Sequence, residues 1–473
     1  MEEELKSSSR RGFLGGVTAL TAASYNRVLG ANDRVGVGFI GFGLIGKQHI
    51  YNFKTSFKDV DRVALCDVYK PRVAEGLAYM ESPNAKGYSD FRKMYEDKNV
   101  DAVVVATPDH WHAMLTIMAC AAGKDVYVEK PLTVFIDEGK WMLQAMNKYK
   151  RVVVVGTQRN HNPGHQTARK IVESGVLGKI QMVKLGAGGR NIYPGFGKTP
   201  VTDPPADFDY DLWLGPAPKR PYQGHRGLYH FRWFWDYSGG QLTNLGAHSV
   251  AAFLLVMGVK GPTKVVSFGG RFTLEDDGET PDLQECLYTF PNFLMTMGVR
   301  EANGYRDSGG SVVMGNKGDL LLGSNQVVPE MHGDPVNQIP RFVGHPTGGP
   351  VYNDTPSVPW IEAQAGAGRG AGGGAGAGRG AGGESMENQM FNANKRDWID
   401  CIKSRNKPFC NLEMGHRTAV VCNLGNMSLR LGGRAIQWDP EKEVVIGDKE
   451  AAAMCTKQYR APWDGVLKSI LKA

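Results

Sequence analysis

The sequence lacks any cysteine pattern that would hold a small fold together. Its 473 residues contain seven cysteines, an odd number, and no C-x-x-C pair. Disulfide frameworks use paired cysteines, and structural zinc sites use Cys or His at short spacings. We therefore interpret the cysteines as core thiols. His110 and His112 have no carboxylate cluster beside them, so we predict no metal site.

Long apolar runs and concentrated charge are also missing. Beyond residue 31 there is no run of eighteen apolar residues, so we expect no stable membrane anchor. The formal net charge of +7 is scattered along the chain, which argues against a nucleic-acid partner. The composition, 42% hydrophobic and 22% charged, is that of a folded globular protein, and the length favours two domains.

The N-terminus carries the pattern of an export signal. Arg10 and Arg11 are followed by Phe13 and Leu14 and by a weakly apolar stretch over 17–23. This order is typical of a twin-arginine signal. We predict that residues 1–31 are such a signal peptide, that the twin-arginine export machinery is a partner, and that the protein is periplasmic or secreted from a bacterium. Core thiols suit a chain that folds in the reducing cytoplasm before export.

A glycine-rich loop follows the first predicted strand, residues 35–40. Gly41, Gly43 and Gly46 have the spacing G-x-G-x-x-G and lead into a helical run. Gly41 permits a tight turn, Gly43 lets backbone amides approach a pyrophosphate, and Gly46 allows close helix packing. The loop predicts a dinucleotide site.

Asp67 ends the second apolar run, about twenty residues after Gly46. A carboxylate at this point binds a ribose 2′-hydroxyl and repels a 2′-phosphate. NAD is therefore the expected cofactor. NADP stays open because Lys70 and Arg72 lie close in sequence.

Further buried strands alternate with helices in the first third of the chain. We predict strands at 101–106, 125–129 and 151–156 and helices at 112–122 and 136–149. This alternation predicts a doubly wound parallel sheet, a Rossmann domain over 34–157. Polar clusters follow three of the strands, at 107–112, 129–131 and 157–161. Ligands of such sheets bind at this carboxyl edge.

The rest of the chain has a different pattern. Short alternating strands after Gly156 predict an α/β domain with an open antiparallel sheet over 158–440, followed by a C-terminal tail over 441–473. Helices near 388–404 and 413–431 are expected to pack back on the first domain. The low-complexity run 364–384, rich in Gly, Ala and Arg, is expected to be a flexible insertion.

Several motifs together resemble the Gfo/Idh/MocA oxidoreductases, named for glucose–fructose oxidoreductase and inositol dehydrogenase. They are "GFIGFGLIG", "DAVVVATPDHWH", "VYVEKPLT", "GTQRN", "GGQLTNLGAH", "WDPEKE" and "YRAPW". The resemblance implies an NAD(P)-dependent oxidoreductase that acts on a sugar, polyol or sugar derivative with a tightly bound nicotinamide cofactor. It also implies a homo-oligomer formed through the antiparallel sheet. A redox-neutral NAD-dependent glycosidase or lyase and a non-catalytic sugar-binding protein remain as alternatives.

Cofactor residues follow from the loop and from the resemblance. The expected set is Gly41, Phe42, Gly43, Leu44, Ile45, Gly46, Asp67, Thr107, Pro108, His112, Glu129 and Lys130. Lys130 is also the expected catalytic base, because the lysine of the family's E-K-P motif stands beside the nicotinamide. Pro131 is expected to be cis on the same grounds.

The family also places an aspartate four residues before a histidine on one helix. Here a helical run over 241–257 carries Asn244 and His248. Asn244 can form hydrogen bonds but cannot supply the charge of an aspartate. His248 is the expected substrate ligand or acid–base group.

A substrate wall is expected just upstream, where aromatic and basic residues mix. Its members would be His230, Arg232, Trp233 and Trp235, with Arg159 reaching the same cleft. Aromatic faces stack on sugars, and Arg and His bind hydroxyls or carboxylates. The alternative is a strand whose aromatic face lies in the core.

Overall fold

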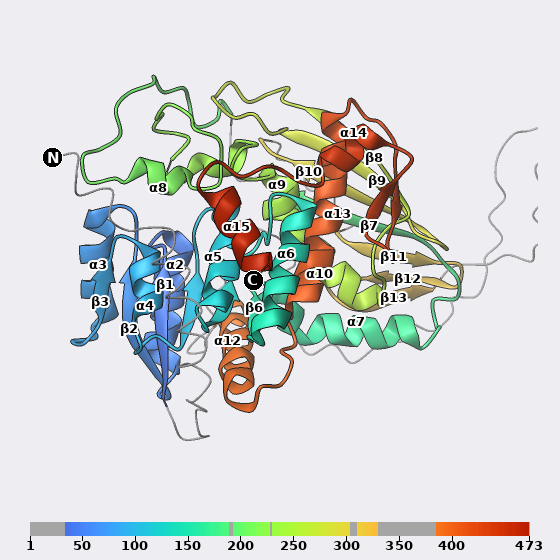
Figure 1. Ribbon diagram of the computed structural model, residues 1–473. Helices are drawn as coiled ribbons and strands as arrows, with labels where there is room; N and C mark the ends of the chain where they lie inside the picture. The colour runs from blue at the N-terminus through green and yellow to red at the C-terminus, as the bar shows by residue number, and fades with distance from the viewer. Residues whose placement is uncertain (1–33, 189–192, 228, 303–309, 330–384, 473) are drawn as a thin grey trace, which may run out of the picture.

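The computed structural model describes residues 34–188, 193–227, 229–302, 310–329 and 385–472. The predicted signal peptide (1–31) and the predicted insertion (364–384) lie outside the described residues. Two β-sheets stand on opposite sides of the molecule, with helices α6, α10 and α13 between them (Figure 1).

The first sheet is fully parallel and has the order β3-β2-β1-β4-β5-β6. Its strands β1, β4, β5 and β6 are buried along their whole length, as expected for a parallel sheet covered on both faces. The strands are β1 (Val35–Ile40), β2 (Val60–Cys66), β3 (Lys86–Tyr88), β4 (Ala102–Val105), β5 (Asp125–Val128) and β6 (Val153–Val155). The helices between them are α2 (Leu44–Ser56), α3 (Lys70–Met80), α4 (Phe91–Glu96), α5 (His112–Ala121) and α6 (Ile136–Tyr149). The predicted Rossmann sheet is confirmed.

The second sheet has nine strands in the order β13-β12-β11-β7-β10-β9-β8-β14-β15. They are β7 (Ile180–Gly188), β8 (Lys264–Gly270), β9 (Leu283–Thr289), β10 (Leu294–Arg300), β11 (Val312–Gly315), β12 (Gly318–Leu321), β13 (Gln326–Pro329), β14 (Ile436–Asp439) and β15 (Val444–Ile446). The sheet is mixed, because β7 and β10 at its centre run parallel. A parallel pair needs a long crossover, and helices α8 to α10 with β8 and β9 supply it.

The remaining helices cover the sheets or lie between them. They are α7 (Pro163–Glu173), α8 (Tyr210–Leu214), α9 (Gly240–Asn244), α10 (Gly246–Met257), α12 (Met386–Ser404), α13 (Leu412–Arg430), α14 (Lys449–Ala453) and α15 (Trp463–Lys472). The helix expected over 241–257 is divided into α9 and α10 at Leu245. The division precedes Gly246, a poor helix former at which a Cβ would lie 3.0 Å from Cε of Met297 in β10. In the part of the chain that the structure describes, no helix is both long and apolar enough to cross a bilayer.

Late segments complete the core of the first domain, as the sequence predicts for 388–404. Trp398 and Ile399 of α12 are buried with β1 and α2 on one face of the parallel sheet. Trp463 and Leu467 of α15 are buried with α5 on the other face. Helix α13 packs against both α6 and β8, so it connects the two sheets. The C-terminal segments therefore hold the two domains together.

Helix α12 also carries a buried lysine, Lys395, which packs against α2 of the first domain. The side chain of Lys395 is fully buried, and its Nζ lies 3.4 Å from Asn52 Oδ1 and 4.6 Å from the ring centre of Phe391. Burial lowers the pKa of Lys395 to about 7, although the charge of Glu129 partly opposes the shift.

We predict that Lys395→Met raises the free energy of unfolding at pH 7 and weakens its pH dependence. The folded-state pKa lies below the unfolded value, so the unfolded chain binds more protons between pH 7 and about 10. The stability of the wild type should therefore rise by about 1.5 kcal/mol from roughly pH 7 to 8.5 relative to the variant. Urea denaturation at several pH values measures this, and parallel curves for the two proteins would contradict it.

Candidate active site

The glycine loop after β1 has the shape that a pyrophosphate needs. Gly41 has a φ of +93°, and a Cβ there would lie 2.6 Å from the carbonyl oxygen of Ala106. A Cβ on Gly46 would lie 2.0 Å from the carbonyl oxygen of Gly41. Around Gly43, by contrast, no described residue other than its immediate chain neighbours has a heavy atom within 4 Å of such a Cβ. Gly41 and Gly46 are required by packing, whereas Gly43 leaves room for a ligand at the N-terminus of α2.

Asp67 joins this loop to the end of β2. Its carboxylate accepts hydrogen bonds from the backbone N–H of Phe42 at 2.8 Å and of Tyr69 at 2.9 Å. Burial raises the pKa of Asp67, and these two bonds partly offset the shift. The carboxylate thus lies directly beside the loop, where a ribose hydroxyl of a dinucleotide would bind.

Thr107 follows β4 at the same edge of the sheet. Its hydroxyl is buried and has no hydrogen-bond partner among the described residues. His112 is buried behind it, with Nδ1 2.7 Å from the carbonyl oxygen of Pro131 and Nε2 3.0 Å from that of Thr107. His112 therefore ties the loops after β4 and β5 together. Pro108, which directly follows Thr107 in the sequence, is partly exposed.

The residues at this edge fit NAD. The open space at Gly43, the Asp67 carboxylate and the buried Thr107 hydroxyl lie at the ends of β1, β2 and β4. Strands β1 and β4 are neighbours although they are not consecutive, and such a switch point is where dinucleotides bind. Leu44 and Ile45 begin α2 beside the loop.

Glu129 is buried directly after β5. Its carboxylate is 2.9 Å from Nε2 of His49 and accepts the backbone N–H of Lys130 at 3.0 Å. Burial by itself raises the pKa of Glu129, but the hydrogen bond from His49 and the charge of Lys130 outweigh it, so the pKa lies below its ordinary value. Burial lowers the pKa of His49 to about 4. A neutral His49 that donates a hydrogen bond to an ionised Glu129 agrees with the lowered pKa of both groups.

Lys130 crosses from the first domain to the second. Its Nζ donates to the Asn244 side-chain Oδ1 at 3.1 Å and to the Asn244 backbone oxygen at 3.2 Å. The Lys130–Pro131 peptide is cis, as expected. The structure thus brings together Lys130 and Asn244, two of the residues predicted to be catalytic.

His248 lies one turn further along, in α10. Its side chain is buried, and its backbone N–H donates to Leu245 at 3.1 Å. Helix α10 also packs on the short helical turn Gln158–His161, which contains Arg159. Arg159 itself is exposed.

The expected substrate wall is only partly exposed. Trp233 is 1% exposed and donates from its indole to Glu301 at 2.7 Å, so it is a core residue and the prediction for it is wrong. His230 is partly exposed and stacks on Phe196 with the ring centres 4.5 Å apart. Arg232 lies against the ring of Tyr229. His230 and Arg232 are both partly exposed to solvent.

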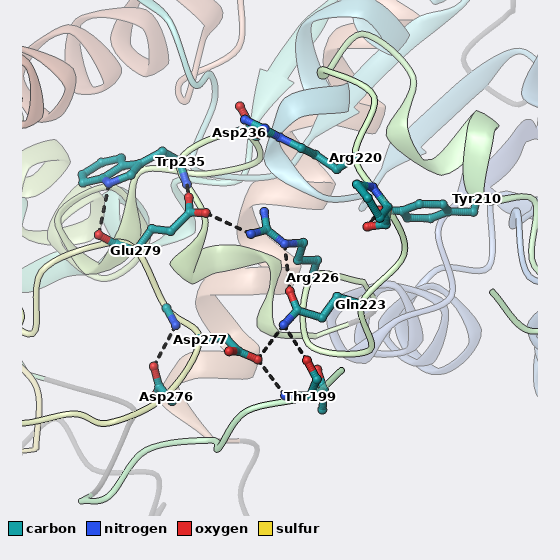
Figure 2. Close-up of polar contacts among 12 residues, drawn as sticks. Thr199, Tyr210, Arg220, Gln223, Arg226, Trp235, Asp236, Asp276, Asp277 and Glu279 are labelled. Atoms are coloured by element: carbon teal, nitrogen blue, oxygen red, sulfur yellow. Dashed lines mark hydrogen bonds and ion pairs between the residues drawn. The ribbon is translucent and has the colours of Figure 1, made fainter. Parts of the chain in front are cut away.

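Trp235 belongs to a polar network that joins two loops of the second domain (Figure 2). Its backbone N–H and indole N–H both donate to Glu279, which also pairs with Arg226. Asp277 accepts from Gln223 and from the backbone of Thr199. The network fixes the loops around 199–236 against 276–279.

Among the residues that the structure describes, no three His, Cys, Asp or Glu side chains are placed to hold a metal ion.

Sequence reasoning missed several polar residues that surround the site. His49 and Glu301 lie in no motif that distinguishes them from ordinary helix or strand residues, and Gln241 lies in "GGQLTNLGAH" but was not singled out within it. Asn160 lies in the polar cluster after β6, and both of its side-chain amide atoms are buried with no hydrogen-bond partner among the described residues. Its place in "TQRNH", at the carboxyl edge of the sheet, was the available signal.

Comparison with known families matches most of the chain. Residues 35–157 match the oxidoreductase family described as having an NAD-binding Rossmann fold. Residues 162–334 and 387–465 match the C-terminal alpha/beta domain of the same oxidoreductase family.

Individual relatives are more distant. Inositol 2-dehydrogenase of Salmonella typhimurium is 31% identical over 147 residues, which are 31% of this chain and 44% of that protein. The matched region thus spans less than half of this relative. The structure of the WlbA dehydrogenase from Bordetella pertussis, in complex with NADH and UDP-GlcNAcA, has a TM-score of 0.59 and 18% identity over 86% of this chain and 99% of that one. Myo-inositol dehydrogenase from Lactobacillus casei, in complex with NAD(H) and myo-inositol, has a TM-score of 0.56 and 16% identity over 86% and 97%. At these identities the structures show a shared fold.

We predict that Asp67→Asn weakens NAD binding about tenfold and weakens NADP binding less. The variant keeps one oxygen for the amides of the loop but removes the charge that favours a ribose hydroxyl and repels a 2′-phosphate. Calorimetric titration of protein freed of its nucleotide, with NAD and with NADP, measures the two affinities. Asp61→Asn, at the far end of β2, is the control and should change neither. Equal losses for NAD and NADP in Asp67→Asn would show that Asp67 does not distinguish the riboses.

Proposed function

We propose, from the premise that this chain belongs to the Gfo/Idh/MocA family of oxidoreductases, that it oxidises a secondary alcohol of a sugar, polyol or sugar derivative with NAD. The observation that carries the proposal is the position of Lys130. Lys130 follows β5 at the carboxyl edge of the parallel sheet, the same edge that carries the glycine loop after β1, and its amine is held by Asn244 of the second domain.

Alcohol oxidation requires a base for the hydroxyl proton. Lys130 supplies it: Asn244 binds two of its N–H positions and thereby fixes the direction of the amine. When bound, NAD supplies the hydride acceptor. The Glu129 carboxylate accepts the backbone N–H of Lys130, and the His112 ring contacts the carbonyl oxygen of the next residue, Pro131.

The substrate class rests on the exposed part of the second domain and on its relatives. His230 stacked on Phe196 offers an aromatic edge, and Arg232 lies nearby on the same turn. Such groups suit a molecule with many hydroxyls and apolar ring faces. The similar proteins named above include dehydrogenases of inositol. His248 is proposed to bind the substrate hydroxyl near Lys130.

We predict that Lys130→Met lowers turnover by at least about a thousandfold and leaves NAD affinity within a factor of about three. The loop and Asp67 supply the nucleotide contacts, whereas the proton acceptor is lost. Turnover is measured with a panel of sugars and polyols, and affinity by calorimetry. Lys140→Met is the control, because this lysine of α6 bonds to Asp137 and to the backbone of Glu443 and to neither Asn244 nor the glycine loop. Activity of Lys130→Met within about tenfold of the wild type would remove Lys130 from the mechanism.

Export by the twin-arginine route is a second part of the proposal. It rests on Arg10 and Arg11 and is supported by the cysteines, all seven of which are described, buried and free. A fold without disulfides can be completed in the reducing cytoplasm, and the twin-arginine pathway carries folded proteins. The nucleotide would then be bound before export, to a periplasmic or secreted protein.

If the cofactor is loaded before export, the purified protein should contain close to one nicotinamide nucleotide per chain. A site outside the cytoplasm has no dependable pool from which to refill, so the nucleotide must be held tightly. Denaturing the protein and assaying the released nucleotide measures the occupancy. An empty preparation that turns over added NAD with ordinary micromolar to millimolar dependence would contradict tight retention.

A homo-oligomer through the second sheet is also proposed. Phe268 of β8, Leu287 of β9 and Leu294 of β10 are 61%, 38% and 41% exposed. The strand registers place the three side chains on one face of the sheet. An apolar patch of this kind is typical of an interface, and sedimentation velocity measures the assembly.

A further inference from the structure

A chain of hydrogen bonds runs from Lys130 into the core of the second domain. Asn244 accepts from Lys130 Nζ at its Oδ1 and donates from its Nδ2 to Gln241 Oε1 at 3.1 Å. Gln241 donates from its Nε2 to Glu301 Oε1 at 2.8 Å. Gln241, Asn244 and Glu301 are 2%, 4% and 4% exposed, so the chain is shielded from solvent.

The two ends of this chain fix the direction of every bond in it. A lysine ammonium can only donate, and an ionised carboxylate can only accept. Glu301 accepts N–H donors at both oxygens, from Gln241 and from the indole of Trp233 at 2.7 Å. Its carboxylate therefore orients the Gln241 amide, which orients the Asn244 amide with its oxygen toward Lys130. An amide alone has no such preference, because its two ends differ little in shape.

We infer that Glu301 is a positioning residue for Lys130, acting through Gln241 and Asn244. The inference rests on the proposed role of Lys130 as the base. The family resemblance implies a charged aspartate at the position that Asn244 occupies in this chain. Here the negative charge is that of Glu301, which directly follows β10 and is two hydrogen bonds further from Lys130. The side-chain amides of Gln241 and Asn244 are oriented by that charge, so the Asn244 oxygen faces Lys130.

Other charged or titratable groups also surround Lys130. Glu129 and Asp109 both interact with its charge. Glu129 is bonded to His49, and Asp109 accepts from Ser238 at 2.5 Å. His112 of α5 lies against the carbonyl oxygen of Pro131, the residue after Lys130, and His248 is buried in α10, one turn after Asn244. None of these groups takes part in the chain of amides, so substitution at Glu301 tests a separate contribution.

The test is the pH at which the Lys130 amine becomes reactive, measured on the purified full chain. Competitive labelling with acetic anhydride across a pH series, followed by peptide mass spectrometry, gives the midpoint for Lys130. We expect Glu301→Gln to move this midpoint to lower pH by about half a unit, because both the charge and the fixed orientation of Asn244 are lost. Glu285→Gln removes an exposed carboxylate from the neighbouring strand β9 and should leave the midpoint unchanged.

Two further variants separate positioning from folding. Gln241→Met breaks the chain in the middle and should produce a shift similar to that of Glu301→Gln. It decides the question by itself if Glu301→Gln does not fold, as judged by circular dichroism. The double variant Gln241→Glu/Glu301→Gln moves the carboxylate next to the Asn244 amide and should restore the midpoint to the wild-type value or above.

The inference is overturned if the midpoint stays at the wild-type value in the folded chain-breaking variants, if Glu285→Gln shifts it equally, or if the double variant fails to restore it. The proposed function is tested separately in the same assay. In wild-type protein freed of its nucleotide, added NAD should slow the labelling of Lys130. If NAD gives no protection, the proposed function fails while the comparison of midpoints stands.

Discussion

The contact between Lys130 and Asn244 is the interaction on which the arrangement of the site depends. It joins the end of β5, in the parallel sheet, to the end of α9, in the second domain. Either domain alone would present an incomplete site, because the nucleotide loop lies on one and the predicted substrate groups on the other. Helix α13 packs on both α6 and β8, and helix α12 packs on both α2 and the turn Gln158–His161, so these two helices connect the parts of the chain that the contact joins.

The first domain achieves its part of the site by burial. Glu129 and His49 lie almost entirely out of solvent, and Lys395 of α12 adds a buried amine to the same region. Buried ionisable groups of this kind are costly unless their partners are fixed. Their presence directly behind the Lys130 backbone indicates that the position of the E-K-P turn is determined by a rigid polar cluster and not by the loop itself.

Local patterns predicted much of this structure. The buried valine-rich strands, the glycine spacing and helix 136–149 all follow from short stretches of sequence, and α6 has those bounds. Contacts between distant residues were not predictable in this way. Gln241 and Glu301 are 60 residues apart, and His49 and Glu129 are 80 apart. Trp233 is of a residue type that often stacks on sugars. Only its burial and the hydrogen bond from its indole to Glu301 show that it is part of the core. Lys395 resembles a surface lysine on an amphipathic helix until α12 is placed on α2.

The central claim is that this edge of the sheet removes a hydride and a proton from the same secondary alcohol. Stopped-flow absorbance of reduced nicotinamide, after mixing NAD-loaded protein with sugars and polyols, tests it most directly. For at least one compound the absorbance should rise, and it should rise more slowly when the carbon that bears the hydroxyl carries deuterium. If no compound in the panel reduces the nicotinamide, or if deuterium at that carbon leaves the rate of its reduction unchanged under single-turnover conditions, the account is contradicted.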